Sequence, residues 1–75
     1  MDWKQTIVTD ADVCGGHPRV KNTRLTVEFL LGLKAAGWSE QQILENYPSL
    51  KPGDLHAVYG YAQAIMQDES FLPAA

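Results

Sequence analysis

The chain has 75 residues, of which 45% are hydrophobic and 20% charged, and its formal net charge is −3. A chain of this length has room for one small core, which excludes two packed domains and a large enclosed active site. The negative charge argues against a protein that coats nucleic acid by bulk electrostatics. The single cysteine, Cys14, excludes an internal disulfide and fits a reducing compartment.

No apolar run in the sequence approaches the ~20 residues that a membrane-spanning helix needs. The first residues, MDWKQT, have no signal-peptide pattern. We therefore expect one cytoplasmic domain over residues 1–75 that makes no contact with a membrane. Within it we expect a ribbon and a Gly/Pro-rich basic loop over residues 5–27, a three-helix core over residues 27–67, and a tail over residues 68–75.

Charge is distributed unevenly along the chain. Residues 1–12 hold three acids and one lysine, residues 13–27 hold three basic residues and no acid, and residues 28–75 hold six acids and two lysines. The basic residues of the middle stretch are Arg19, Lys21 and Arg24. This stretch is either a solvated loop or a contact surface for a negatively charged partner.

The N-terminal third is predicted to be extended. Residues 6–9 and residues 24–27 are short runs rich in β-branched side chains, and the Gly, Pro and Asn residues within 14–22 favour turns between them. We expect the two runs to pair as a short antiparallel ribbon. Because an isolated two-stranded ribbon is only marginally stable, it needs a helical layer or a partner chain to pack against.

Helical periodicity begins at residue 27. The apolar residues that recur with this period are Val27, Leu30, Leu31 and Ala35. Thr26 is predicted to cap this first helix, and Gly37 is predicted to end it in the left-handed conformation.

A second helix is predicted from its capping residues. Ser39 and Gln42 have the spacing of a capping box, and Trp38 and Ile43 have the spacing of a hydrophobic staple. We expect about two turns that end before Pro48, since a proline disfavours helix at the preceding residue.

The third helix is predicted to start at Pro52, with the negative charge of Asp54 in its first turn, and to end near Gln67. Its apolar face consists of Leu55, Val58, Tyr59, Ala62, Ile65 and Met66. We expect the central core to contain Leu55, Val58, Tyr59 and Ile65. The predicted fold class is mainly α, a three-helix homeodomain-like helix-turn-helix core with an N-terminal β-ribbon, although a small helical bundle shows the same pattern.

Candidates for chemistry are few. Cys14, His17 and His56 are the sulfur and imidazole ligands that the sequence offers, one fewer than the four ligands of a structural zinc site. Gly15 and Gly16 belong to no phosphate-binding motif, and we expect them to supply the positive φ of a tight turn. We therefore expect no enzyme, no catalytic residue, no metal and no cofactor.

A set of motifs indicates a family. Residues 15–27 are GGHPRVKNTRLTV, residues 36–39 are AGWS, residues 47–50 are YPSL, and Tyr-Ala follows at residues 61–62. In order and spacing they resemble the family called domain of unknown function 433, over about residues 5–65. The structural motif residues within the first block are Gly15, Gly16, Pro18, Asn22 and Thr23. Asn22 stands where the family usually has glycine, and asparagine tolerates the left-handed conformation.

The resemblance implies a homeodomain-like helix-turn-helix fold with an N-terminal ribbon. Some members of the family are VapB-like antitoxins, whose genes sit beside a PIN-like ribonuclease toxin. We therefore expect a small regulator, the antitoxin-type component of a toxin–antitoxin pair. The alternative is a protein-interaction module that has kept the fold without binding DNA. In either case a homodimer is expected, formed through the ribbon and part of a helix, because a small core leaves apolar and edge surface uncovered.

The residues that would contact DNA or a partner are expected in the basic loop. After Lys51 the third helix has no Lys or Arg, so it lacks the cations that phosphate contacts need. The contact candidates are therefore Arg19, Lys21, Arg24 and His17. For Arg24, a structural role is favoured over DNA contact, with its guanidinium bound to loop carbonyls or to a carboxylate such as Asp10.

Overall fold

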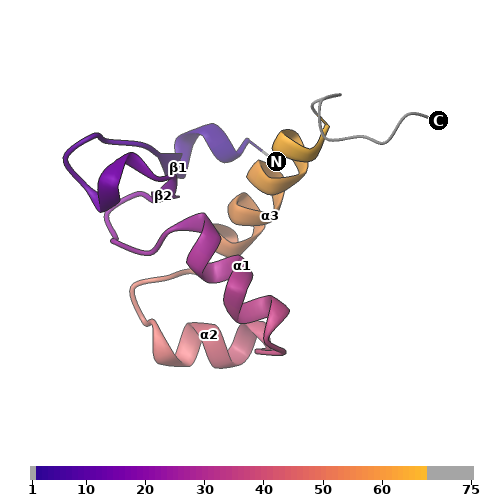
Figure 1. Ribbon diagram of the computed structural model, residues 1–75. Coiled ribbons are helices and arrows are strands. Elements are labelled where there is room, and N and C mark those ends of the chain that lie inside the picture. The colour runs from indigo at the N-terminus through magenta and orange to yellow at the C-terminus, as the bar shows by residue number, and fades with distance from the viewer. Residues whose placement is uncertain (1, 68–75) are drawn as a thin grey trace.

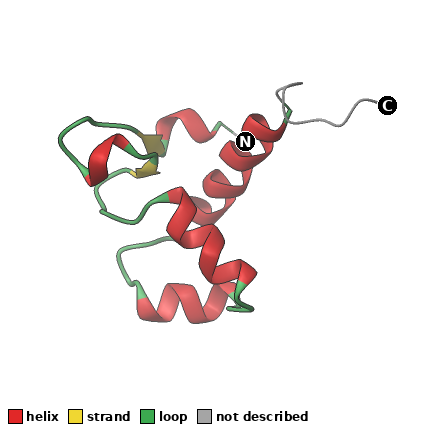
Figure 2. Ribbon diagram, viewed as in Figure 1, coloured by secondary structure: helices red, strands yellow, loops and turns green. Residues whose placement is uncertain are grey.

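Three α-helices and a two-stranded ribbon make up residues 2–67, the part of the chain that the computed structural model describes (Figures 1 and 2). In chain order the elements are the 3₁₀ turn η1 (Trp3–Gln5), strand β1 (Ile7–Val8), the 3₁₀ turn η2 (Cys14–Gly16), strand β2 (Arg19–Val20), and helices α1 (Val27–Ala35), α2 (Glu40–Asn46) and α3 (Pro52–Met66). The predicted fold class is confirmed. The predicted tail, residues 68–75, lies outside the described residues.

The ends of α1 follow the sequence prediction. The hydroxyl of Thr26 accepts a hydrogen bond from the backbone N–H of Phe29 at 3.1 Å and so caps the helix. Beyond the last turn, Gly37 adopts φ 97°, and the chain reverses there into α2.

The capping box of α2 is complete. The Gln42 backbone N–H donates to the Ser39 hydroxyl at 3.1 Å, and the Ser39 backbone N–H donates to the Gln42 side-chain oxygen at 2.8 Å. Ile43 is fully buried and Trp38 is half-buried against the core. The helix ends at Asn46, two residues before Pro48, as predicted.

Helix α3 is the longest element and packs against α1, α2, β1 and η1. It begins at Pro52, and the Asp54 carboxylate accepts a hydrogen bond from the backbone N–H of Lys51 at 2.8 Å. Near its middle, Gly60 lies beside the Trp3 side chain, and Trp3 packs edge-on against Tyr61 with ring centroids 4.8 Å apart. Turn η1 therefore covers a face of α3 that the other helices leave open.

The ribbon forms, but its predicted pairing was wrong. Strand β1 pairs antiparallel with β2, Ile7 opposite Val20 and Val8 opposite Arg19, and residues 24–27 do not pair with β1. The cause is a tight turn at Asn22, which adopts φ 66°. This turn folds the following residues onto the other edge of β2, where the Val20 N–H donates to the Leu25 carbonyl at 3.0 Å.

The core lies where the ribbon, α1, α2 and the first half of α3 meet. Its buried residues are Ile7, Val20, Val27, Leu30, Ile43, Leu50, Leu55, Ala57 and Val58. Leu55 and Val58 are fully buried as predicted, and Tyr59 is half-buried. Placing Ile65 in the core was wrong, because its side chain is 39% exposed. Figure 1 shows the reason: the last turns of α3 extend beyond α2 and run toward the N-terminus.

The helices of residues 2–67 are short. The longest has 15 residues, and none is long and apolar enough to cross a membrane.

Candidate partner-binding groove and basic loop

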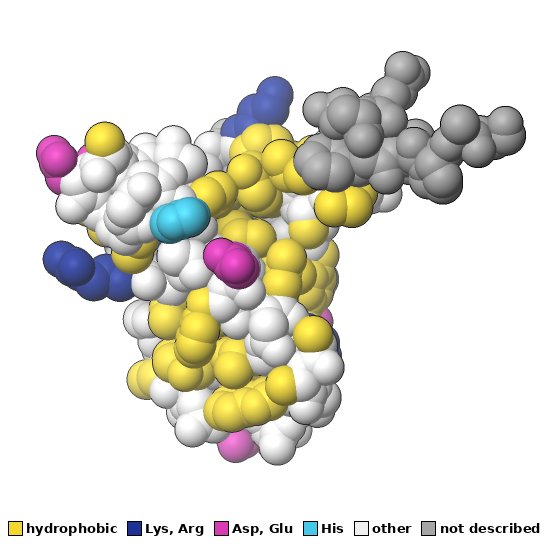
Figure 3. Space-filling view, in the orientation of Figure 1, with side chains coloured by type: hydrophobic (Ala, Val, Ile, Leu, Met, Phe, Trp, Pro, Cys, Tyr) yellow, Lys and Arg dark blue, Asp and Glu magenta, His cyan; other side chains and the backbone are white. Residues whose placement is uncertain are grey.

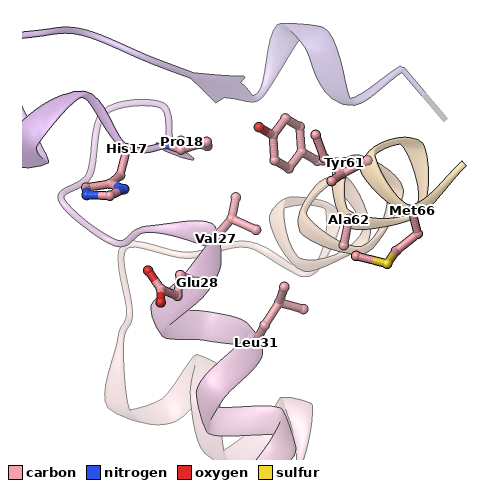
Figure 4. Close-up of a pocket in the computed structure, with 9 residues that line it drawn as sticks. His17, Pro18, Val27, Glu28, Leu31, Tyr61, Ala62 and Met66 are labelled. Carbon is pink, nitrogen blue, oxygen red and sulfur yellow. The ribbon is translucent and has the colours of Figure 1, made fainter. Parts of the chain in front are cut away.

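The loop between β1 and β2 contains a left-handed turn just before His17. Cys14, Gly15 and Gly16 have φ values of 52°, 64° and 81° in succession. The turn is closed by the Gly16 N–H bonding to the Val13 carbonyl at 3.0 Å and the His17 N–H bonding to the Cys14 carbonyl at 3.2 Å. Glycine adopts positive φ values without steric strain, so Gly15 and Gly16 permit this turn, as expected from the sequence. Their position places the following His-Pro pair beside α1 and α3 (Figure 4).

Arg19 holds the loop together. Its Nη1 donates to the Thr23 carbonyl at 3.0 Å across the turn, and its Nε is buried without a hydrogen-bond partner among residues 2–67. This bond to a loop carbonyl is the role that the sequence analysis gave to Arg24. The Arg24 side chain is exposed, and its backbone carbonyl lies 3.5 Å from the Cys14 sulfur. A charge reversal at Arg19 would therefore disrupt the loop as well as any contact surface.

The four contact candidates do not form one patch. Arg19 is half-buried under the turn, Arg24 is exposed on the loop, His17 lines an apolar groove, and Lys21 lines a separate polar hollow. Four of the structural motif residues belong to turns, namely Gly15, Gly16, Asn22 and Thr23, whereas Pro18 directly precedes β2 and its carbonyl accepts a hydrogen bond from the Val27 N–H at 2.9 Å.

The apolar groove has a volume of about 300 Å³. It lies between the loop, the start of α1 and the C-terminal half of α3. It is lined by His17, Pro18, Val27, Glu28, Leu31, Tyr61, Ala62, Ile65 and Met66. Figure 3 shows hydrophobic side chains gathered over this face of the molecule.

The His and Glu side chains of the apolar groove lie on one side of it. Figure 4 shows His17 on the loop and Glu28 on α1, with Leu31 farther along α1 and with Ala62 and Met66 across from them on α3. The apolar side remains accessible, since Ile65 is 39% exposed and Met66 is 56% exposed.

The apolar groove was not predicted from the sequence, although the length of the apolar face of α3 is a signal for it. The apolar face of α3 continues to Met66 over 15 residues, whereas α1 has nine and α2 has seven. The last turns of α3 extend beyond α2 (Figure 1), and there the face stays uncovered. The uncovered end of an apolar face is where an accessible hydrophobic site forms.

The polar hollow lies at the other side of the ribbon turn and has a volume of about 280 Å³. It is lined by Gln5, Thr6, Lys21, Asn22, Thr23, Ser49, Lys51 and Asp54. The two lysines are 30 positions apart in the sequence, so their proximity depends on the fold. From the sequence, Lys51 was noted only as the residue after which the third helix has no Lys or Arg.

One polar contact joins α2 to α3. The Tyr59 hydroxyl donates a hydrogen bond to the Glu40 carboxylate at 2.9 Å. Burial, with further contributions from this bond and from the negative charge of Glu40, raises the pKa of Tyr59 to about 12.

Possible metal ligands are scattered over the fold. Within the described range 2–67, no group of three His, Cys, Asp or Glu side chains is arranged so that it could hold a metal ion.

Comparison with known proteins places the chain in a family. A family model described as "Protein of unknown function (DUF433)" matches residues 7–62, which is more than half of the chain. The chain belongs to the DUF433 family. The resemblance found from the motifs is thereby confirmed.

Two similar proteins show how this chain compares in length. The uncharacterized protein y4eO of Sinorhizobium fredii (strain NBRC 101917 / NGR234) is 33% identical over 61 residues, which are 81% of this chain and 28% of that protein. A crystal structure of a DUF433 member protein from Anabaena variabilis ATCC 29413 matches with a TM-score of 0.76 and 33% identity, over 88% of this chain and 63% of that one. The chain therefore spans less than two thirds of either relative.

The DUF433 match includes the ribbon, the loop, α1, α2 and most of α3, and it ends at residue 62. Ile65 and Met66, which form the open end of the apolar groove, follow the matched segment. Because the family is described as one of unknown function, the role of the groove has to be inferred from its chemistry.

Proposed function

We propose that this DUF433 protein is a non-enzymatic cytoplasmic regulator that binds another protein in its apolar groove, as the antitoxin-type component of a toxin–antitoxin pair. The observation that carries the proposal is the groove itself. It is apolar along α3 and open to solvent where Ile65 and Met66 are exposed. Exposed apolar surface of this kind marks protein-interaction sites.

The groove offers a favourable surface for an apolar side chain of a partner. Burying a whole Ile or Met side chain contributes about 1.5–3 kcal/mol. Ile65 and Met66 are already partly covered, so we expect them together to contribute about 2 kcal/mol on binding. Methionine adapts to partners of different shape, which suits it to a contact surface.

The polar side of the groove sets the orientation of the partner. Glu28 lies in the first turn of α1 and is exposed, and His17 lies beside it (Figure 4). A basic side chain of a partner would pair with Glu28 while its apolar neighbours enter the groove. We therefore expect a bound segment that combines apolar residues with a Lys or Arg.

A PIN-like ribonuclease is the proposed partner. The choice rests on the resemblance of the motifs to DUF433, because some members of that family are VapB-like antitoxins whose genes neighbour such ribonucleases. In this proposal the protein inhibits the ribonuclease by occupying its surface and contributes no catalytic group.

The test is a purification from the native host with a tagged protein. We expect the wild type to retain a PIN-like ribonuclease and to inhibit its cleavage of RNA. The double variant Ile65→Asp with Met66→Asp should lose both effects, because two charges would enter the groove. Gln63→Asp is the matched control, since Gln63 is exposed on the same helix and does not line the groove.

Thermal unfolding separates loss of binding from loss of the fold. The groove variant should melt near the wild type, because both substituted side chains are exposed. The proposal is contradicted if the wild type retains no ribonuclease, or if the groove variant binds and inhibits as the wild type does.

A second candidate function is a protein-interaction module that does not bind DNA. The observation that favours it is the composition of α3, which has no Lys or Arg between Pro52 and Met66. This candidate uses the same groove, but it has no antitoxin role and makes no DNA contact.

A further inference from the structure

The walls of the polar hollow are fixed by the fold. The backbone N–H of Lys21 donates to the Thr6 carbonyl at 2.8 Å, which holds the ribbon turn against the residue before β1. Asn22 turns the chain there with φ 66°. The buried side chain of Leu50 anchors the opposite wall immediately before Lys51. Because these walls are in place without a ligand, binding would have to order side chains of the hollow but not its backbone.

The charges around the polar hollow favour an anion. Lys21 and Lys51 contribute two ammonium groups, and Asp54 contributes one carboxylate, which leaves one net positive charge. The Asp54 Oδ2 atom is engaged by the Lys51 backbone N–H at 2.8 Å. The N-terminal end of the 15-residue helix α3 adds a partial positive charge close to the hollow.

Neutral donors from separate segments complete the lining. Gln5 and Asn22 carry amide groups and Ser49 carries a hydroxyl, and all three residues are exposed. The Thr23 hydroxyl is already used, because it donates to the Val20 carbonyl at 2.7 Å. Donors that converge from three segments suit a tetrahedral oxyanion, whose oxygens accept hydrogen bonds in several directions.

We propose that the polar hollow binds a phosphate group of the double-stranded DNA backbone through Lys21 and Lys51. The position of Lys51 favours DNA as the source of the phosphate. Lys51 directly precedes α3, the second helix of the α2–turn–α3 unit. In helix-turn-helix proteins the N-terminal end of this helix approaches DNA, and surrounding groups hold the phosphates. This inference deepens the proposed regulatory role and rests on it, but it makes no use of the apolar groove.

The direct test is DNA binding followed by fluorescence anisotropy. The probe is a labelled duplex of about 30 base pairs from the region upstream of the gene, titrated at several salt concentrations. The double variant Lys21→Gln with Lys51→Gln should bind about tenfold more weakly at low salt, and its dependence of log K on log salt should be shallower by about two. Lys4→Gln is the matched control, because Lys4 is exposed and does not line the hollow.

A substitution that removes the negative charge from the polar hollow provides a second test. Asp54→Asn removes the carboxylate and keeps an oxygen that can accept from the Lys51 N–H, so it should strengthen DNA binding. If the double lysine variant binds DNA with the affinity and salt dependence of Lys4→Gln, the proposal is overturned.

Inorganic phosphate distinguishes a free anion from DNA as the ligand. In the wild type, phosphate should shift the backbone amide resonances of Lys21, Asn22 and Lys51, and these shifts should be absent in the double lysine variant. Phosphate binding without DNA binding would overturn DNA as the source, and no response to either probe would overturn the site.

The failure of this inference can be told apart from the failure of the proposed function. The groove variant with Ile65→Asp and Met66→Asp should keep its DNA affinity, and the double lysine variant should keep its ribonuclease. If either the ribonuclease experiment or the DNA experiment fails, its result therefore identifies which of the two surfaces was assigned incorrectly.

Discussion

Arg19 and Arg24 are five positions apart in one basic loop, yet the fold gives them different environments. Arg19 reaches under the turn to the Thr23 carbonyl, whereas the Arg24 side chain is exposed. The sequence analysis could identify the loop and its cations, because composition defines both. It could not assign their roles, since these depend on the turn at Asn22 and on which edge of β2 residues 24–26 cover.

The two arginines should respond differently to a change of side chain. We expect Arg19→Lys to lower the free energy of unfolding by about 1–2 kcal/mol, because an ammonium group cannot reproduce the bond to Thr23 and remain solvated. Arg24→Lys should change it by less than about 0.5 kcal/mol. Urea unfolding of both variants measures the difference, and equal effects would contradict the structural role of Arg19.

Ionisation of the Tyr59 hydroxyl should make the free energy of unfolding depend on pH in the alkaline range. Its pKa is about 12 in the folded protein, against an ordinary value of 10.0. The folded state therefore holds this proton more tightly than the unfolded state does. The resulting stabilisation of the fold is complete below pH 10 and declines as the pH rises from 10 toward 12. Tyr59→Phe should cost about 1 kcal/mol at pH 8, through loss of the hydrogen bond to Glu40.

The comparison of wild type and Tyr59→Phe at each pH isolates this group from other titrations. The difference between their unfolding free energies should be constant up to about pH 9 and shrink above pH 10. A difference that stays constant to pH 11 would contradict the assigned interaction with Glu40.

At the scale of elements, the signals that act within one helical turn predicted the structure well. The Thr26 cap, the Ser39 capping box and the Pro52 start depend on residues three or four positions apart, and each forms as predicted. The ribbon pairing and the environment of Ile65 depend on contacts between distant segments, and there the prediction failed. Periodicity identifies the apolar face of a helix but does not say how much of it a neighbour covers.

Helix α3 should therefore be sensitive to substitution near its N-terminal end and tolerant of substitution near its C-terminal end. Leu55 is fully buried, so Leu55→Ala should lower the free energy of unfolding by about 2–5 kcal/mol. Ile65→Ala on the same helix should cost less than about 1 kcal/mol, because Ile65 is 39% exposed. Thermal or urea unfolding gives both values, and a similar cost at the two positions would contradict the observed coverage of α3.

At the scale of the whole molecule, two surfaces with different chemistry lie on a small fold. The apolar groove and the polar hollow share no lining residue. A regulator of this design can hold a protein at one surface and a phosphate at the other at the same time. Neither surface was predicted from the sequence, because each brings together residues from three separate segments.

The homodimer stays a prediction, and the structure narrows where it would form. Residues 25 and 26 cover one edge of β2, so the free edge of the ribbon is that of β1. Sedimentation at high micromolar concentration should show a dimer, and a species of 8.3 kDa would contradict it. The groove variant should also be dimeric, and a monomeric groove variant would place the second copy in the groove instead.

The most direct test of the proposed function is a map of amide chemical shifts in the isotope-labelled protein, recorded with and without the ribonuclease that co-purifies with it. Binding in the apolar groove predicts the largest changes at Val27, Leu31 and Tyr61, and at the exposed pair Ile65 and Met66, with the signals near Lys21 and Lys51 unchanged. Changes centred on the polar hollow, with the groove residues undisturbed, would contradict the assignment of the groove as the partner-binding surface.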